Sequence, residues 1–222
     1  MSGNRHLNVR FRELLDSAEG QAEFVIAVVV DVRGFSSFAM KVESMQTAAY
    51  LKRVYQKLLD NYFHDASFYK PTGDGLLATF TYTEASLKTV AANVMESCMK
   101  VIDDFPRLCE GDEMVNFDVP DKLGIGLCRG AASRLVSDGM TLDYSGRPLN
   151  IASRLMDLAR PSGLVVDATF GTKLIPPEIM ARFSSAEVYP RGMSLGKPMS
   201  VLFTRDLTVI PPSATQPPAE SG

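Results

Sequence analysis

The chain has little of what disulfide or zinc chemistry requires. Its 222 residues include no tryptophan, three cysteines (Cys98, Cys109 and Cys128) and two histidines (His6 and His64). The cysteines lack Cys-x-x-Cys spacing, and two widely separated histidines cannot complete a zinc site, so a disulfide scaffold and a zinc module are excluded. We expect reduced, mostly buried thiols in a cytoplasmic protein.

Long apolar runs, excess positive charge and common nucleotide-binding motifs are also missing. The apolar run at residues 25–30 is far too short to cross a bilayer, and the N-terminus has no apolar signal core. With 23 Lys and Arg against 26 Asp and Glu, the net charge is −3, which does not support a nucleic-acid surface. No P-loop, complete dinucleotide fingerprint or Gly-x-Ser-x-Gly is present. We therefore expect no nucleic-acid partner and no direct membrane contact.

Strand and helix patterns alternate through most of the chain. Residues 24–32 form an apolar, β-branched run typical of a central strand covered on both faces. Apolar residues recur at helical spacing over Ser44–Phe63 and Ala85–Ile102. The remaining predictions are a strand–turn–strand at 69–80, strands at 122–128, 140–143, 163–167, 184–189 and 199–204, a short strand at 114–119, a turn at 129–132, a helix from Pro148 to Ala159, and short helical pieces within 170–180.

This order predicts an α/β (α+β) fold in one domain. The expected architecture is a ferredoxin-like split βαβ sandwich, enlarged by extra strands, with a mixed sheet and flanking helices. Residues 1–20 are expected to form an N-terminal arm or short helix, because Phe11–Leu15 is an amphipathic patch in a polar stretch. Residues 21–207 form the domain itself. Residues 208–222 are a proline-rich tail that we predict to be disordered.

Two carboxylates are expected where apolar strands end. Asp31 follows the apolar run at 24–30, and Asp74 lies in a Thr-Gly-Asp-Gly turn before the apolar run at 76–80. A single aspartate in a turn usually serves the turn alone. Two such carboxylates can converge on a divalent cation, and Mg²⁺ or Mn²⁺ binds through one or two carboxylates together with substrate phosphates. The spacing therefore suggests phosphoryl transfer.

Several donors could meet a nucleotide. Asn150 and Arg154 are four residues apart on a predicted helix, so they share one face and both can donate to phosphate oxygens. Asp143 lies at a strand end, where it could accept from a base amine or cap the following turn. Lys70 could donate to a base or pair with Asp143. For each of these residues, an ordinary solvated surface position is the alternative.

Two further cations lie in a late loop, between the last two predicted strands. Arg191 follows one strand and Lys197 precedes the other, so either could meet a triphosphate. Loop cations are usually solvated, and the residues alone do not choose between the two.

Four segments, in this order, resemble the catalytic domain of class III nucleotide cyclases over residues 22–205. They are Val-Asp-Val-Arg-Gly-Phe-Ser (30–36), Lys-Pro-Thr-Gly-Asp (70–74), Leu-Gly-Ile-Gly-Leu-Cys-Arg-Gly (123–130) and Asp-Tyr-Ser-Gly-Arg-Pro-Leu-Asn-Ile-Ala-Ser-Arg-Leu (143–155). Any one of them is a weak signal, whereas four in sequence at the family's distances are specific. The resemblance implies a metal-dependent lyase that converts a ribonucleoside triphosphate to a 3′,5′-cyclic nucleotide and pyrophosphate.

The resemblance also implies a role for each candidate residue. Asp31 and Asp74 would bridge two Mg²⁺ or Mn²⁺ ions with the Val32 carbonyl as a further ligand, Lys70 and Asp143 would read the base, Asn150 and Arg154 would stabilise the transition state, and Arg191 would hold the triphosphate tail. In this family the metal residues come from one subunit and the other residues from its partner. All of them are present in this chain, so a symmetric homodimer with two sites is implied.

The base is left open between pyrimidine and adenine. A Lys/Asp pair is the family's ATP-reading choice. However, Pro71 after Lys70 and Arg147-Pro148 before the Asn150 position depart from common forms, and the bare domain resembles the pyrimidine cyclases of bacterial Pycsar antiphage systems. Those enzymes make cyclic UMP or cyclic CMP and signal to a separate effector.

Val29 occupies the position of a bulky aromatic found in some of the Pycsar enzymes, which argues against the match. On architecture we favour UTP or CTP as the substrate, with ATP as the alternative. The alternative from a different class of function is a regulatory module that binds a nucleotide without turning it over.

Overall fold

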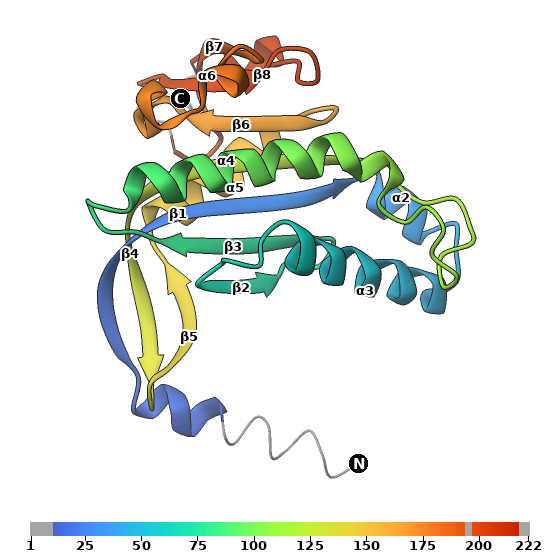
Figure 1. Ribbon diagram of the computed structural model, residues 1–222, viewed down its shortest axis with the longest axis horizontal. Coiled ribbons are helices and arrows are strands. Elements are labelled where there is room, and N and C mark those ends of the chain that lie inside the picture. Colours follow the sequence, from blue (N-terminus) through green and yellow to red (C-terminus); the bar gives the residue numbers. More distant parts are fainter. Residues whose placement is uncertain (1–10, 194–196, 218–222) are drawn as a thin grey trace, which may run out of the picture.

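An eight-stranded mixed sheet forms the centre of the computed structural model, which describes residues 11–193 and 197–217 (Figure 1). The strand order is β2-β3-β1-β4-β6-β8-β7, and β5 pairs with β4 outside this path. β4 and β6 are parallel, whereas the other pairs are antiparallel. The strands are β1 (Glu19–Arg33), β2 (Phe68–Pro71), β3 (Gly75–Thr81), β4 (Lys122–Ser137), β5 (Met140–Ser145), β6 (Gly163–Asp167), β7 (Phe183–Val188) and β8 (Met199–Thr204).

Helices cover both faces of the sheet, which confirms the predicted mixed α/β architecture (Figure 1). Along β1, Ile26 and Val28 pack in the cluster under α3 and α4, whereas Val25 and Val29 pack in the cluster under α5. The helices are α2 (Phe35–Ala39), α3 (Ser44–Asn61), α4 (Leu87–Asp104), α5 (Arg147–Leu158) and α6 (Pro177–Met180), with short turns η1 (Phe105–Arg107), η2 (Ala168–Phe170), η3 (Thr172–Leu174) and η4 (Pro212–Ala214). Since successive side chains of a strand point to opposite faces, burial on both faces explains the uninterrupted apolar run.

β1 and β4 are much longer than predicted. They pair without interruption from Glu19 opposite Val136 to Arg33 opposite Lys122. The predicted turn at 129–132 is therefore wrong, because these residues continue β4 and bond the N-terminal half of β1. The N-terminal half of β1, the C-terminal half of β4 and β5 together form an arm that extends away from the rest of the sheet (Figure 1).

The predicted strand at 114–119 is also wrong. These residues form turns and irregular structure between η1 and β4. Val115 is buried, and the ring of Phe117 stacks on that of Phe38 with centroids 6.2 Å apart. The apolar residues of this segment therefore fill the core from a loop, where a strand pattern is not needed to bury them.

The two ends of the chain were predicted to lie outside the domain. Residues 11–16 are helical, in agreement with the short helix expected there, and residues 1–10 lie outside the described residues. The tail prediction is wrong for residues 208–217. Thr208 and Ala214 are buried, and the backbone N–H of Tyr189 donates to the Ala214 carbonyl at 2.7 Å. Residues 218–222 lie outside the described residues.

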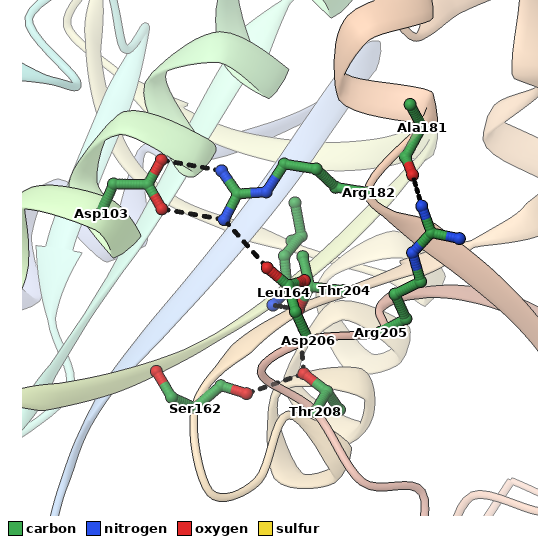
Figure 2. A network of polar contacts seen from close by, with 9 residues as sticks. All are labelled: Asp103, Ser162, Leu164, Ala181, Arg182, Thr204, Arg205, Asp206 and Thr208. Atoms are coloured by element: carbon green, nitrogen blue, oxygen red, sulfur yellow. Dashed lines mark hydrogen bonds and ion pairs between the residues drawn. The ribbon is translucent and has the colours of Figure 1, made fainter.

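A polar network joins the start of this tail to β6 and β8 (Figure 2). The hydroxyl of Thr204 accepts from the Leu164 N–H at 3.1 Å and lies 3.0 Å from the Thr208 hydroxyl. Thr208 in turn donates to the Ser162 carbonyl at 2.7 Å. Nearby, Arg182 makes two hydrogen bonds to Asp103 at the end of α4. The two hydrogen bonds of Thr208 hold the start of the tail, because they satisfy its hydroxyl inside the protein.

We expect Thr204→Val to lower the free energy of unfolding by about 1–3 kcal/mol, because it removes the acceptor of the buried Leu164 N–H and one of the two hydrogen bonds of the Thr208 hydroxyl. Urea unfolding of the variant measures this loss. Thr215→Val is the matched control, since Thr215 is exposed and its hydroxyl contacts only the Pro212 carbonyl within the described structure. Equal stability of Thr204→Val and the wild type would show that the network does not hold the tail.

No helix within residues 11–193 and 197–217 is long and apolar enough to cross a membrane.

Candidate active site

The register of the sheet aligns Lys70, Leu77 and Val29 in one row across β2, β3 and β1. Lys70 lies opposite Leu77, Leu77 opposite Val29, and Val29 opposite Gly126 of β4. Directly opposed residues share one face of a sheet, so these side chains lie on the face that α5 covers. Lys70 comes from β2, which tolerates Pro71 because it is the edge strand.

Gly126 lets α5 lie directly on the sheet beside this row. A Cβ atom at Gly126 would lie 1.9 Å from the Ala152 carbonyl oxygen and 2.3 Å from the Met156 nitrogen. A larger residue would push the helix away from the strand. α5 begins at Arg147 with Pro148 in its first turn, as predicted, and its exposed side includes Asn150 and Arg154.

Lys70 and Asp143 form a salt bridge. The Lys70 Nζ lies 2.8 Å and 2.7 Å from the two carboxylate oxygens of Asp143, and both side chains are about two-fifths exposed. Asp143 also accepts from the Tyr144 N–H at 2.8 Å, and the Tyr144 ring lies against that of Phe68, with centroids 5.5 Å apart. The structure thus shows the Lys70–Asp143 pairing that was considered from the sequence. The Lys70 ammonium is a hydrogen-bond donor that lies beside an acceptor, the Asp143 carboxylate.

Asp31 and Asp74 lie at neighbouring strand ends. Asp31 is opposite Gly75, and the Val32 N–H donates to the Asp74 carbonyl at 3.1 Å. Burial raises the pKa of Asp31, the nearby Asp74 charge raises it further, and the Arg33 charge opposes both. Gly75 permits this approach, because a Cβ atom there would lie 2.0 Å from the Val30 carbonyl oxygen.

Arg33 is a site residue that the sequence analysis missed. Its side chain is 7% exposed, and Nη1 lies 2.5 Å from Oδ2 of Asp31. Burial lowers the pKa of Arg33, and the Asp31 charge opposes that effect. An arginine two residues after Asp31 in an otherwise apolar strand is the signal that could have identified it, since both side chains then share one face.

Asn150 and Arg154 line a cavity of about 810 Å³ together with Lys197. Arg191 lies outside it and lines a neighbouring pocket of about 440 Å³ with Arg154 and Arg160. Of the two loop cations considered from the sequence, Lys197 therefore shares the cavity of both helix residues. The loop approaches the helix at Gly192, where a Cβ atom would lie 4.0 Å from Nη2 of Arg154.

Within the described residues, the candidate side chains form three separate groups. One is the Asp31–Asp74 pair, one is the Lys70–Asp143 pair, and one is the cavity of Asn150 and Arg154. Neither aspartate of the first group and neither member of the second lines that cavity. Within one chain, the cavity of Asn150 and Arg154 is therefore formed without either of these pairs.

The Asp31–Asp74 pair fits a hard divalent ion. The donor set is two carboxylates at adjacent strand ends, and residues 11–193 and 197–217 hold no cluster of three or more His, Cys, Asp or Glu side chains. Mg²⁺ usually keeps several waters and binds through one or two carboxylates plus substrate phosphates, so two carboxylates suffice. The negative charge of Asp74 raises the pKa of Asp31, and a cation bound nearby would offset this repulsion between the two carboxylates.

Solved structures with the same fold include adenylyl and guanylyl cyclases. The adenylyl cyclase CyaB from P. aeruginosa matches with a TM-score of 0.65 and 17% identity over 83% of this chain and 95% of that chain. The guanylyl cyclase Cya2 matches with a TM-score of 0.65 and 17% identity over 88% and 98%. A non-canonical dimeric guanylyl cyclase domain of the RhoGC fusion protein from the aquatic fungus Blastocladiella emersonii matches with a TM-score of 0.59 and 14% identity over 85% and 97%.

No protein-family model matches the chain, and no curated protein sequence matches it either. The structural matches nevertheless cover most of the chain, which therefore has the fold of class III nucleotide cyclase catalytic domains.

Proposed function

We propose that this protein is a nucleotide cyclase that converts a ribonucleoside triphosphate to a 3′,5′-cyclic nucleotide and pyrophosphate. The observation that carries the proposal is the Asp31–Asp74 carboxylate pair at adjacent strand ends of a cyclase fold. A fold alone does not assign a function, whereas this pair supplies ligands for the ions that phosphoryl transfer uses.

In this proposal Asp31 and Asp74, with the Val32 carbonyl, would hold two Mg²⁺ or Mn²⁺ ions. When bound, these ions would lower the pKa of the ribose 3′-hydroxyl and neutralise charge on the triphosphate. Arg154 donates to the phosphoryl oxygens as their charge grows, and Asn150 orients the same group from one turn away. The 3′ oxygen forms its bond to the α-phosphorus while pyrophosphate leaves. Lys197 or Arg191 binds the leaving phosphates.

The complete site requires a second copy of the chain. Asp31 and Asp74 lie apart from the cavity of Asn150 and Arg154 in one chain, and a symmetric homodimer places the cavity of each chain against the aspartates of the other. Two equivalent sites follow. A guanylyl cyclase domain with the same fold also forms a dimer, described as non-canonical, which supports self-association of this fold and not one particular arrangement.

For the base we propose uracil or cytosine. Pro71 and Arg147-Pro148, which depart from the common forms of the family, support this choice, whereas Val29 argues against it. Lys70 and Asp143 then bond the adjacent acceptor and donor of the base edge. Adenine presents the same kind of edge, and ATP is therefore the alternative substrate. A separate effector and a role in antiphage defence follow from the resemblance and belong to the same proposal.

We expect cyclic UMP or cyclic CMP as the main product when UTP, CTP, ATP and GTP are each supplied with Mn²⁺. Mass spectrometry of each reaction identifies the product. Cyclic AMP as the main product would keep the cyclase proposal and overturn the pyrimidine assignment. No product from any of the four would favour the non-catalytic nucleotide-binding module.

A further inference from the structure

Arg33 connects the metal-binding carboxylates with the end of helix α5. Nη1 bonds Asp31, while Nε and Nη2 lie 3.2 Å and 3.0 Å from the Ala159 carbonyl oxygen. Nη2 also donates to the Met156 carbonyl. One buried guanidinium therefore bonds a strand-end carboxylate and two carbonyls at the C-terminal end of α5.

The neighbouring strand leaves room for this arrangement. Gly124 of β4 lies opposite Asp31, and a Cβ atom there would lie 1.9 Å from Nη2 of Arg33 and 2.5 Å from its Nε. Any other residue at this position would displace the guanidinium. Asp31, Arg33 and Gly124 thus form one unit, in which the glycine provides space that the arginine fills.

We propose that Arg33 is a positioning residue that orients Asp31 for metal binding and ties it to α5, the helix that carries Asn150 and Arg154. This inference rests on the proposed cyclase function. The bond from Arg33 uses Oδ2 of Asp31, and a carboxylate has a second oxygen that can bind a cation. In the proposed homodimer, Asp31 serves one active site while α5 of the same chain serves the other. Arg33 therefore connects the two sites within each subunit.

A purely structural role predicts a different result. Arginine often bonds the last carbonyls of a helix simply to cap it. In that case, removing Arg33 lowers stability, but the folded variant binds metal as tightly as the wild type. A positioning role predicts weaker metal binding by the folded variant, because partners that orient a metal ligand are typically worth about 10- to 100-fold in affinity or activity.

The first experiment measures binding of Mn²⁺ alone, with free Mn²⁺ followed by electron paramagnetic resonance. We expect Arg33→Met to bind Mn²⁺ about 10- to 100-fold more weakly than the wild type. Arg33→Lys should recover only part of this loss, because an ammonium lacks the planar fork that reaches Asp31 and the α5 carbonyls together. If Arg33→Met does not fold, Arg33→Lys is the variant whose Mn²⁺ affinity tests the positioning role. Unchanged Mn²⁺ affinity in the folded variants, or no Mn²⁺ binding by the wild type, would overturn the positioning role.

The second experiment separates the two contacts of Arg33. In a mixed dimer of an Arg154→Ala chain and an Asp74→Ala chain, the single intact site takes its aspartates from the first chain and its α5 from the second. We expect Arg33→Met to lower kcat when it is placed on either chain, by about 10- to 100-fold on the first. A loss confined to the first chain would overturn the tie to α5. No loss on either chain would overturn the whole inference. An inactive mixed dimer without any Arg33 change would instead contradict the proposed shared site.

Discussion

Replacing Asp74 with alanine is expected to eliminate cyclic-nucleotide formation while the domain stays folded. The proposal makes Asp74 one of two side-chain ligands for ions that act directly on the reacting groups. Losing one preorganised electrostatic contact to a transition state costs about 10²- to 10³-fold in kcat, and loss of an ion removes several such contacts. Asp74 is half-buried in the turn between β2 and β3, so truncation leaves the sheet pairing intact.

Product formation at saturating Mn²⁺ and thermal unfolding of the same sample measure both parts of this expectation. Asp65→Ala is the matched control, because Asp65 is a highly exposed aspartate just before β2. Full activity in Asp74→Ala would contradict the assignment of Asp74 to the metal site. A variant that fails to unfold cooperatively would show that Asp74 is needed for the fold instead.

Asp31 calls for a different substitution. Asp31→Ala leaves the buried Arg33 guanidinium without its carboxylate, and breaking a buried ion pair in this way is strongly destabilising. Truncating Asp31 is therefore expected to cost stability, whereas truncating Asp74 is not. Asp31→Asn keeps an oxygen acceptor for Arg33 while it removes the negative charge, so it is the variant that tests metal binding at this position.

Mixing two inactive variants, Asp74→Ala and Arg154→Ala, is expected to restore activity to about a quarter of the wild-type value. In an equal mixture with free exchange, half of the dimers are mixed, and each of these has one intact site out of two. Arg154 is about half-exposed, so its truncation spares the core. Activity of the exchanged mixture tests this value, and the mixed dimer purified through two different tags should reach about half of the wild-type activity.

The control for this experiment pairs Asp74→Ala with Asp31→Asn. Both changes fall in the metal half of the site, so their mixed dimer has no intact site and should stay inactive. Recovery in that control would show that the aspartates belong to different sites. Absence of recovery with Arg154→Ala, once exchange is verified, would contradict a site shared between two chains.

Local pattern was enough to predict most elements of this fold. The helices α3 and α4 follow from apolar residues at helical spacing, α5 follows from the prolines at its start and beyond its end, and Gly163–Asp167 is a strand as predicted. Each of these signals lies within or next to one element, so it can be recognised without knowing what the element packs against. The resemblance of four segments to class III cyclases predicted the fold that the solved structures show.

Long-range pairing decided what local pattern could not. The length of β4 depends on β1 lying beside it, and the placement of residues 208–217 depends on their bonds to Ser162 and Tyr189, which are far from them in the chain. The strand prediction at 114–119 failed for the same reason, since burial there comes from loop packing.

By itself, the sequence determined which chemical groups this protein has and which elements carry them. Asp31, Asp74, Asn150 and Arg154 occupy the strand ends and the helix that were predicted for them. Only the tertiary structure showed that Lys70 bonds Asp143, that Lys197 shares the cavity of Arg154, and that Arg33 bonds both Asp31 and α5. The physical reason is that strand register and helix packing bring together residues many positions apart, whereas composition and periodicity describe only neighbours along the chain.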